Sequence, residues 1–384
     1  MGEFKINTMR PLFMVDLKSQ YQKIKPQIDA SIQQVIDNTQ FIKGPSVKEF
    51  QNSLSEYLGV KHVIACGNGT DALQIAMMAM GLKPGDEVLT TNFTFIATVE
   101  VIALLGLKPV LVDVDEKTFN IDINKIKAAI TPKTKAIVPV HLFGQSANME
   151  AIQTIAKKNK LYVIEDNAQA IGGDYIFLNG ESKKTGTIGD IGTTSFFPSK
   201  NLGCYGDGGA LFTNNDNLAE KISMIVNHGM KKRYYHDMIG VNSRLDSIQA
   251  AVLQVKLPFL NEYCKARQKV ATAYNEAFKD ISAIETPYVE KYSSHVYHQY
   301  TLKIKNGNRD KLKQWLEEKG VPAMIYYPVP LHLQKAFKEF KSQDENFPIT
   351  EKLSKSVISL PMHTELDDEQ IGYICNSVIE FFNQ

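Results

Sequence analysis

The sequence has few cysteines and no excess of charge of either sign. Its four cysteines, Cys66, Cys204, Cys264 and Cys375, lie far apart and form no CxxC pair. This spacing argues against a disulfide framework or a structural metal and fits a reducing cytoplasm. The 43 basic and 42 acidic residues leave a formal net charge of +1. Such a balance provides no basic field for nucleic acid or for an anionic membrane surface.

Long apolar runs are missing as well. The start, MGEFKINTMRPLF, carries charges where a signal peptide has its apolar core. The segment VEVIALLGLKPVLV is interrupted by Glu100, Lys108 and Pro109, whereas a membrane helix needs about 20 apolar residues. We therefore expect a cytoplasmic protein that binds neither membrane nor nucleic acid.

The composition is that of a globular protein whose 384 residues, 43% of them hydrophobic, can bury a large core. Short β-rich runs alternate with helical stretches near 71–80, 94–106, 123–130 and 149–159; the runs are HVIAC, EVLTT, PVLVDVD, KAIVPVHL and LYVIED. This alternation predicts a largely parallel sheet covered on both faces. Ser46 and Glu49 have the spacing of a capping box for a further helix that ends near Gly59.

The pattern of predicted helices and strands changes after Arg244. One long helical run, interrupted at Pro258, is followed past residue 285 by a smaller mixture of strands and helices. We therefore predict a large domain over 1–255, and a long helix with a small C-terminal domain over 256–384, the boundary falling within 255–285.

Three polar features follow predicted strands, where ligands of parallel sheets bind. GNGTDAL places Thr70 and Asp71 at a helix N-terminus, EDNAQ ends a strand with Asp166, and SFFPSKNLGCYGDGG surrounds Lys200 with constrained backbone. Each has a plain structural explanation: a helix cap, an ion pair with a structural arginine, a solvated lysine. Together, however, an amine nucleophile, a carboxylate for a ring nitrogen and a phosphate cradle are what pyridoxal phosphate requires.

The order of the motifs resembles the DegT/DnrJ/EryC1/StrS family of sugar aminotransferases from about Phe13 to Phe382. The runs that carry the resemblance are GNGTDAL, NFTFIAT, PVHLFGQ, EDNAQAIGG, SFFPSKNLGCYGDGG, NHG, GVNSRLDSIQAAVLQVKL and YYPVPLHLQ. The resemblance implies an α/β fold of the type I, aspartate-aminotransferase-like class, with a mostly parallel sheet in the large domain and a smaller C-terminal αβ domain. It also implies pyridoxal 5′-phosphate as cofactor.

The resemblance further implies roles for individual residues. Lys200 matches the catalytic Schiff-base lysine, Asp166 the partner of the ring nitrogen, Gln169 the residue near the phenolic oxygen and Phe95 the aromatic stacked on the ring. Gly69, Thr70 and Ser195 match phosphate contacts. Asn242 matches an asparagine that reaches the phosphate from the neighbouring subunit, so we expect a homodimer with shared active sites.

Family acceptors are nucleotide-linked keto sugars and glutamate is the usual amino donor. Arg244, Tyr326, Tyr327 and His332 are the candidates for substrate contacts, although Tyr326 stands where members that aminate C3 usually have histidine. The pattern looks most like enzymes acting on UDP-2-acetamido-2-deoxy-3-oxo-glucuronate in surface-polysaccharide or lipopolysaccharide pathways. A dTDP-3-keto-6-deoxyhexose is the rival acceptor.

Other readings of the same residues stay open. Lysine rather than histidine at position 200 favours amino transfer over sugar dehydration, which similar proteins catalyse. A non-catalytic regulator that keeps the fold, and a lysine aldolase without cofactor, are the rival functions. We interpret His141, His228 and His236 as structural because they lack metal spacing, and Cys204 as passive.

Overall fold

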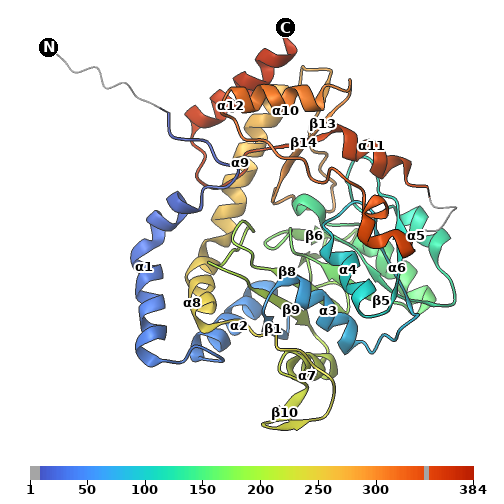
Figure 1. Ribbon diagram of the computed structural model, residues 1–384. Helices are drawn as coiled ribbons and strands as arrows, with labels where there is room; N and C mark the ends of the chain where they lie inside the picture. Colours follow the sequence, from blue (N-terminus) through green and yellow to red (C-terminus); the bar gives the residue numbers. More distant parts are fainter. Residues whose placement is uncertain (1–8, 341–345) are drawn as a thin grey trace.

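The computed structural model describes residues 9–340 and 346–384 and is built around a seven-stranded sheet (Figure 1). The strand order is β1-β9-β8-β5-β4-β2-β3, and β9 alone of these seven runs against the others. The predicted, mostly parallel sheet is therefore confirmed. The strands are β1 (His62–Cys66), β2 (Glu87–Thr91), β3 (Lys108–Val112), β4 (Thr134–Val138), β5 (Tyr162–Asp166), β8 (Ile191–Ser195) and β9 (Gly209–Thr213).

Successive strand residues point to opposite faces of this sheet, and helices pack against both faces. In β1, Ile64 packs in the core formed with α3 (Gly69–Ala79), α4 (Ala97–Leu104) and α7 (Asp216–Ile225). Its neighbour Val63 packs in the core formed with α2 (Pro45–Leu58) and α8 (Ser247–Lys256). The same second face carries α5 (Ile123–Ala129) and α6 (Met149–Asn159) against Ile137 and Val163.

The C-terminal part has a core of its own. Helix α9 (Leu260–Phe278) leads away from the large sheet, as Figure 1 shows, toward a three-stranded antiparallel sheet. That sheet is covered by helices, and the elements are β12 (Ile284–Glu285), β13 (Tyr300–Ile304), β14 (Val357–Leu360), α10 (Arg309–Glu318), α11 (Pro348–Ser356) and α12 (Asp368–Phe382). The boundary within 255–285 stays a prediction, since α9 packs in both the large and the small core.

The remaining elements lie at the periphery. They are α1 (Leu17–Asn38), β6 (Asp174–Ile176), β7 (Ser182–Lys184), β10 (Met230–Lys232) and β11 (Tyr235–His236), with short 3-10 turns at 142–144, 257–259, 331–333 and 335–340. Across the described ranges, none of the helices has the length and apolar character that a bilayer crossing requires.

The predicted capping box before α2 is wrong. The helix begins at Pro45, and its N-cap residue is Gly44. No side chain makes a capping hydrogen bond at this helix start. Proline suits a first helical position because its missing N–H would have had no partner there. The Ser46 hydroxyl instead donates to the carbonyl oxygen of Ser247, 3.0 Å away, and so ties α2 to α8.

Candidate active site

A cavity of about 790 Å³ lies at the carboxyl ends of the parallel strands. It is lined by most of the predicted site residues, which come from separate segments: Gly69, Thr70, Phe95, Asp166, Gln169, Ser195, Lys200, Tyr326 and Tyr327. A smaller hollow of about 330 Å³, with Lys157 and Asp190 in its lining, lies near the start of β5 and contains none of them. The large cavity is therefore the candidate site.

Lys200 lies in a tightly bonded loop after β8. Its backbone N–H donates to the carbonyl oxygen of Phe197 at 2.8 Å, and the Cys204 N–H donates to that of Phe196 at 2.8 Å. A Cβ at Gly203 would lie 2.3 Å from the Pro198 carbonyl oxygen, so only glycine fits there. Burial lowers the pKa of the Lys200 amine to about 8, against the opposing charge of Asp166. The neutral fraction of this amine near neutral pH is thus much larger than that of an ordinary lysine.

Asp166 is the last residue of β5 and is 5% exposed. Its carboxylate accepts from the Thr98 hydroxyl at 2.8 Å and from the Ala168 N–H at 3.1 Å. Within the described residues no cation forms an ion pair with it, so the interpretation as the partner of a structural arginine is not supported. A buried carboxylate that faces a cavity with spare acceptor capacity suits a cationic N–H group of a ligand.

Gln169 joins the sheet to the C-terminal part. Its Oε1 accepts from the Phe143 N–H at 2.7 Å, and its Nε2 donates to the Tyr327 hydroxyl at 3.1 Å. Burial raises the pKa of Tyr327, so this hydroxyl stays protonated and remains a donor into the cavity. The ring of Phe95, 54% exposed, stands 6.3 Å from that of Tyr327, centroid to centroid, and offers a flat apolar face.

The predicted phosphate contacts meet at the start of α3. The helix begins at Gly69, two residues before the predicted start at 71, with Asn68 as N-cap that accepts from the Asp71 N–H at 2.7 Å. Backbone N–H groups of a first helical turn favour a phosphate. A Cβ at Gly69 would lie 2.6 Å from the Cβ of Ser195, so glycine is what lets β8 approach this helix end.

Three predicted site residues do not line this cavity. Asn242 is exposed and accepts from the Arg244 guanidinium at 2.5 Å on a segment paired with Asn227. His332 is 6% exposed: its Nδ1 bonds the Asn92 amide at 2.7 Å and its Nε2 lies 3.3 Å from Glu351. His332 therefore does not line the cavity, and its contact with the substrate stays a prediction.

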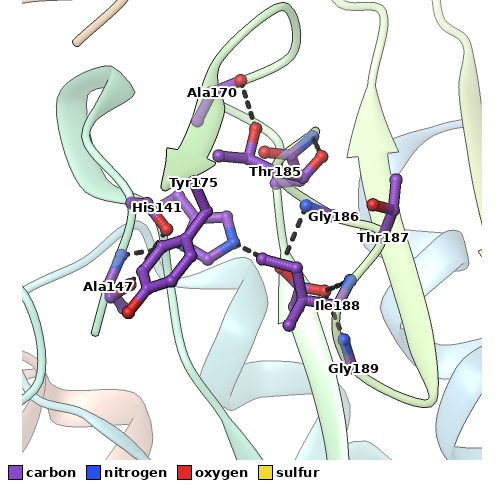
Figure 2. A network of polar contacts seen from close by, with 12 residues as sticks. His141, Ala147, Ala170, Tyr175, Thr185, Gly186, Thr187, Ile188 and Gly189 are labelled. Atoms are coloured by element: carbon purple, nitrogen blue, oxygen red, sulfur yellow. Dashed lines mark hydrogen bonds and ion pairs between the residues drawn. The ribbon is translucent and has the colours of Figure 1, made fainter. Parts of the chain in front are cut away.

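The interpretation of His141 as structural agrees with its surroundings, shown in Figure 2. Its Nδ1 accepts from the Ala147 N–H at 3.1 Å, so the ring proton sits on Nε2 and is donated to Glu165 at 2.8 Å. The same carboxylate accepts the N–H groups of Gly186, Ile188 and Gly189. This network anchors the strand that ends at Asp166. Cys204 is also passive, because burial raises the pKa of its thiol to about 11.

Sequence reasoning missed several residues of the site. Asn68, His298 and Gln299 line the cavity, and Thr98 orients Asp166 from α4. Asn68 could have been found, since asparagine is a preferred N-cap. His298 and Gln299 precede β13, far from every motif, and nothing in their neighbourhood indicates a ligand. In the described part of the chain, no group of three or more His, Cys, Asp or Glu side chains is placed to hold a metal ion.

Comparisons with known proteins agree with this geometry. The chain is 48% identical over 371 residues to a "pleiotropic regulatory protein" of Geobacillus stearothermophilus, covering 96% of this chain and 98% of the other. It is 48% identical over 361 residues to the UDP-2-acetamido-2-deoxy-3-oxo-D-glucuronate aminotransferase of Pseudomonas aeruginosa, covering 94% and 98%.

Solved structures of aminotransferases are also similar to this chain. An aminotransferase from Brucella abortus superimposes with a TM-score of 0.92 at 41% identity, covering 97% of this chain and all of the other. DesV of S. venezuelae gives 0.93 at 33% identity and covers 98% of this chain. The expected fold class is confirmed. Since a family profile also matches residues 22–379, the chain belongs to the DegT/DnrJ/EryC1/StrS aminotransferase family.

Proposed function

We propose that the protein is a pyridoxal-phosphate-dependent aminotransferase that transfers an amino group from an amino acid, L-glutamate, to C3 of UDP-2-acetamido-2-deoxy-3-oxo-glucuronate. The observation that carries the proposal is the meeting of Lys200, Asp166 and the Gly69–Thr70 helix end in one cavity. The chain's 48% identity to an enzyme that is named for this acceptor supports the choice of sugar.

The residues present fit the cofactor. The N-terminus of α3 and the Ser195 hydroxyl suit a phosphate, Asp166 has acceptor capacity left for a pyridinium N–H, and the exposed face of Phe95 suits an aromatic ring. Pyridoxal phosphate, when bound, supplies a carbonyl carbon that takes up the amino group and a ring that withdraws electrons. Each of the chain's own groups then has a separate task.

Lys200 binds and moves protons. Its partly neutral amine is suited to attack a carbonyl carbon. Once the amine is free again, it is suited to take a proton from the carbon that bears the amino group and to give this proton to a different carbon atom. The closed loop around Gly203 fixes where this amine can reach. Asp166, held by Thr98, keeps a negative charge in place, which favours a protonated ring nitrogen.

We assign the binding of the cofactor phosphate, by Asn242, and of the sugar nucleotide, by Arg244, Tyr326 and Tyr327, to residues of two subunits. Tyr326 and Tyr327 line the chain's own cavity, whereas Asn242 and Arg244 lie outside it. A homodimer in which each chain lends these two residues to its partner's site accounts for both facts. The Arg244 guanidinium is suited to a bidentate bond with the uronate carboxylate or a phosphate.

Two alternatives have specific support. Relatives at 34% and 40% identity are named as dTDP-amino-sugar transaminases, which keeps a dTDP-linked 3-keto sugar as the rival acceptor. One relative at 48% identity is named a regulatory protein. A regulator without turnover has no need of a lysine whose amine is held partly neutral beside a buried carboxylate, so catalysis is the favoured function.

The acceptor assay decides between the sugars. The purified protein, supplied with cofactor and glutamate, is offered UDP-linked 3-keto-uronate and dTDP-linked 3-keto-hexose under matched conditions. We expect kcat/KM to be at least about tenfold higher for the uronate, since one carboxylate–arginine bond is worth roughly 1.5–3 kcal/mol. The same preference should vanish in Arg244→Gln if this residue binds the uronate. Equal or reversed preference would contradict the proposed substrate.

We place the reaction in the cytoplasm, in line with four free cysteines.

A further inference from the structure

One wall of the cavity is built where two distant segments meet. The segment 324–334, which we call the tyrosine loop, lies against the run 92–95 that follows β2. The ring of Tyr327 stands 6.1 Å from that of Phe93 and 6.3 Å from that of Phe95, centroid to centroid. Tyr327 and Phe95 both line the cavity. The spacing between the two segments therefore sets the width of the cavity at this wall.

The buried side chain of Asn92 holds the far end of the tyrosine loop with both ends of its amide. Its Oδ1 accepts from the backbone N–H of His332 at 3.0 Å, which leaves its Nδ2 to donate to the ring Nδ1 of His332 at 2.7 Å. The backbone carbonyl oxygen of Asn92 also accepts from the Leu331 N–H at 3.4 Å. Because Nδ1 accepts, the ring proton of a neutral imidazole lies on Nε2.

The other ring nitrogen of His332 is turned toward α11. Nε2 lies 3.3 Å from Oε1 of Glu351, in the first turn of that helix, and can donate its proton there. The start of α11 is in turn bound to the residue after β3, because the Asp113 carboxylate accepts from the N–H groups of Ile349 at 3.0 Å and of Thr350 at 2.9 Å. Since β2 and β3 pair in the sheet, these contacts form a closed ring that passes through the imidazole.

We propose that His332 is a positioning residue for the amino acceptor: it holds the tyrosine loop at the spacing from Phe95 at which the two tyrosines of the loop contact the sugar. The proposal rests on the proposed aminotransferase function. Its role is indirect, because the residue is 6% exposed and the cavity is lined by Tyr326 and Tyr327 instead. Small displacements of groups that orient a substrate are costly to a reaction, so such a support matters.

The two sides of this contact are held unequally. Asn92 continues β2, and its backbone N–H donates to the Val112 carbonyl oxygen at 2.9 Å within the large sheet. The tyrosine loop contains no longer element than the 3-10 turn at 331–333. Loss of the imidazole bonds should therefore displace the loop, while Lys200 and Asp166, which lie at other strands, keep their places. We expect the defect to fall on the step that uses the sugar.

Three substitutions at position 332 separate the two ring bonds from the packing. His332→Phe keeps a ring and removes both bonds. His332→Asn returns an acceptor near the place of Nδ1, whereas His332→Gln returns a donor near that of Nε2. His363→Phe is the matched control, since His363 is 3% exposed, lies outside the cavity wall and uses its Nδ1 to accept from the Glu365 N–H at 3.2 Å.

The first measurement needs no turnover: it is hydrogen exchange of the backbone N–H groups of Leu331 and His332 in the apoprotein. We expect both to exchange about tenfold faster in His332→Phe, to stay near the wild-type rate in His332→Asn, and to be unchanged in His363→Phe. Unchanged exchange in His332→Phe overturns the inference. If that variant does not fold, His332→Asn should still exchange more slowly than His332→Gln, and equal rates in these two overturn it.

The second measurement takes the two half-reactions apart. We expect His332→Phe to leave the conversion of bound pyridoxal phosphate by glutamate within about twofold of the wild-type rate. The KM of the pyridoxamine form for UDP-linked 3-keto-uronate should rise at least about tenfold, and His332→Asn should recover most of it. Equal losses in both half-reactions overturn the inference. A wild type that glutamate does not convert contradicts the proposed function instead, and leaves the exchange result standing.

A double-mutant cycle with Asn92→Leu then separates positioning from direct contact. Asn92 is 0% exposed and is not part of the cavity wall, so it can affect the sugar only through its neighbours. If His332 acts through Asn92, the KM for the sugar in the double variant should be no more than about twofold above that of His332→Phe. Losses that multiply would mean that His332 contacts the sugar independently of Asn92, and would overturn the inference.

Discussion

The amine of Lys256 donates a hydrogen bond of 2.6 Å to the carbonyl oxygen of Gly203. Lys256 is the last residue of α8 and is 1% exposed, and burial lowers the pKa of its amine to about 8. Gly203 belongs to the loop that carries Lys200, and the close approach of Pro198 leaves no room for a side chain there. A buried lysine thus holds the catalytic loop from inside the protein.

We predict that Lys256→Met weakens cofactor binding while leaving the fold intact. Methionine fills the same volume and removes a buried charge, which offsets part of the lost hydrogen bond. The loop then loses its internal anchor, and we expect the dissociation constant of pyridoxal phosphate to rise about tenfold, since a bond to a charged donor is worth roughly 1.5–3 kcal/mol. A spectroscopic titration measures it. Lys279→Met, at an exposed lysine paired with Glu276, is the control; equal affinities in all three proteins would remove the role of Lys256.

Gly69→Ala tests the phosphate cradle. The new Cβ would lie 2.6 Å from the Cβ of Ser195, so β8 and the start of α3 must separate. We expect at least a tenfold loss of affinity for pyridoxal phosphate, and a loss of binding of free inorganic phosphate by the apoprotein, because both use the N–H groups of this turn. Calorimetric titration measures both.

The control for this substitution is Gly372→Ala. Gly372 lies within α12, and a Cβ there meets nothing within 4 Å. Alanine should leave phosphate and cofactor affinity unchanged and stabilise the helix by up to about 1 kcal/mol. A Gly69→Ala protein that binds phosphate as well as Gly372→Ala does would show that the ligand lies elsewhere.

The lowered pKa of Lys200 predicts a pH-dependent stability of the apoprotein. In the unfolded chain the amine titrates near 10.5, and in the folded protein near 8. The folded state therefore binds fewer protons between these values, so the penalty of burying the charge is full below pH 8 and fades as the pH rises toward 10.5. Lys200→Met, which has no charge to bury, should be more stable than the wild type by about 1–3 kcal/mol at pH 7. Denaturant unfolding of both apoproteins at pH 7 and pH 10 measures the gap, which should shrink; a constant gap contradicts the assigned cause.

Much of the site can be predicted from the sequence because its residues lie at or after the ends of strands. Asp166 ends a strand that a run of apolar residues identifies, Gly69 and Lys200 come after two others, and strand ends of a parallel sheet meet at one edge. The chemistry of the three residue types then points to one cofactor. No long-range packing has to be known for this step.

The supports of the site do not follow from the sequence, because they are contacts between distant segments. Nothing near Lys256 indicates a bond to Gly203, and nothing near His298 indicates a cavity. The predicted start of α2 is wrong because the Ser46 hydroxyl bonds the backbone of Ser247 in α8 and does not cap its own helix. Such partners depend on the folded arrangement, in which tertiary contacts override local preferences.

The proposed dimer makes a prediction about mixed chains. Lys200→Ala and Asn242→Asp should each be nearly inactive alone, the first for lack of the amine, the second because a carboxylate repels phosphate. If Asn242 serves the partner's site, a dimer of one chain of each kind contains one site with both defects and one with neither. Mixing after partial dissociation should therefore restore up to about a quarter of wild-type activity in the whole sample. No activity above the sum of the two separate proteins would mean that each chain works with its own Asn242.

The most direct test is the absorbance of the cofactor-loaded protein before and after L-glutamate is added without any sugar. We predict that the wild type takes up pyridoxal phosphate in a lysine-bound form and that glutamate converts it to pyridoxamine phosphate, while Lys200→Ala does neither at a comparable rate. A wild-type spectrum that glutamate leaves unchanged, or a Lys200→Ala protein that converts as fast as the wild type, would contradict the assignment of Lys200 as the residue that carries the reaction.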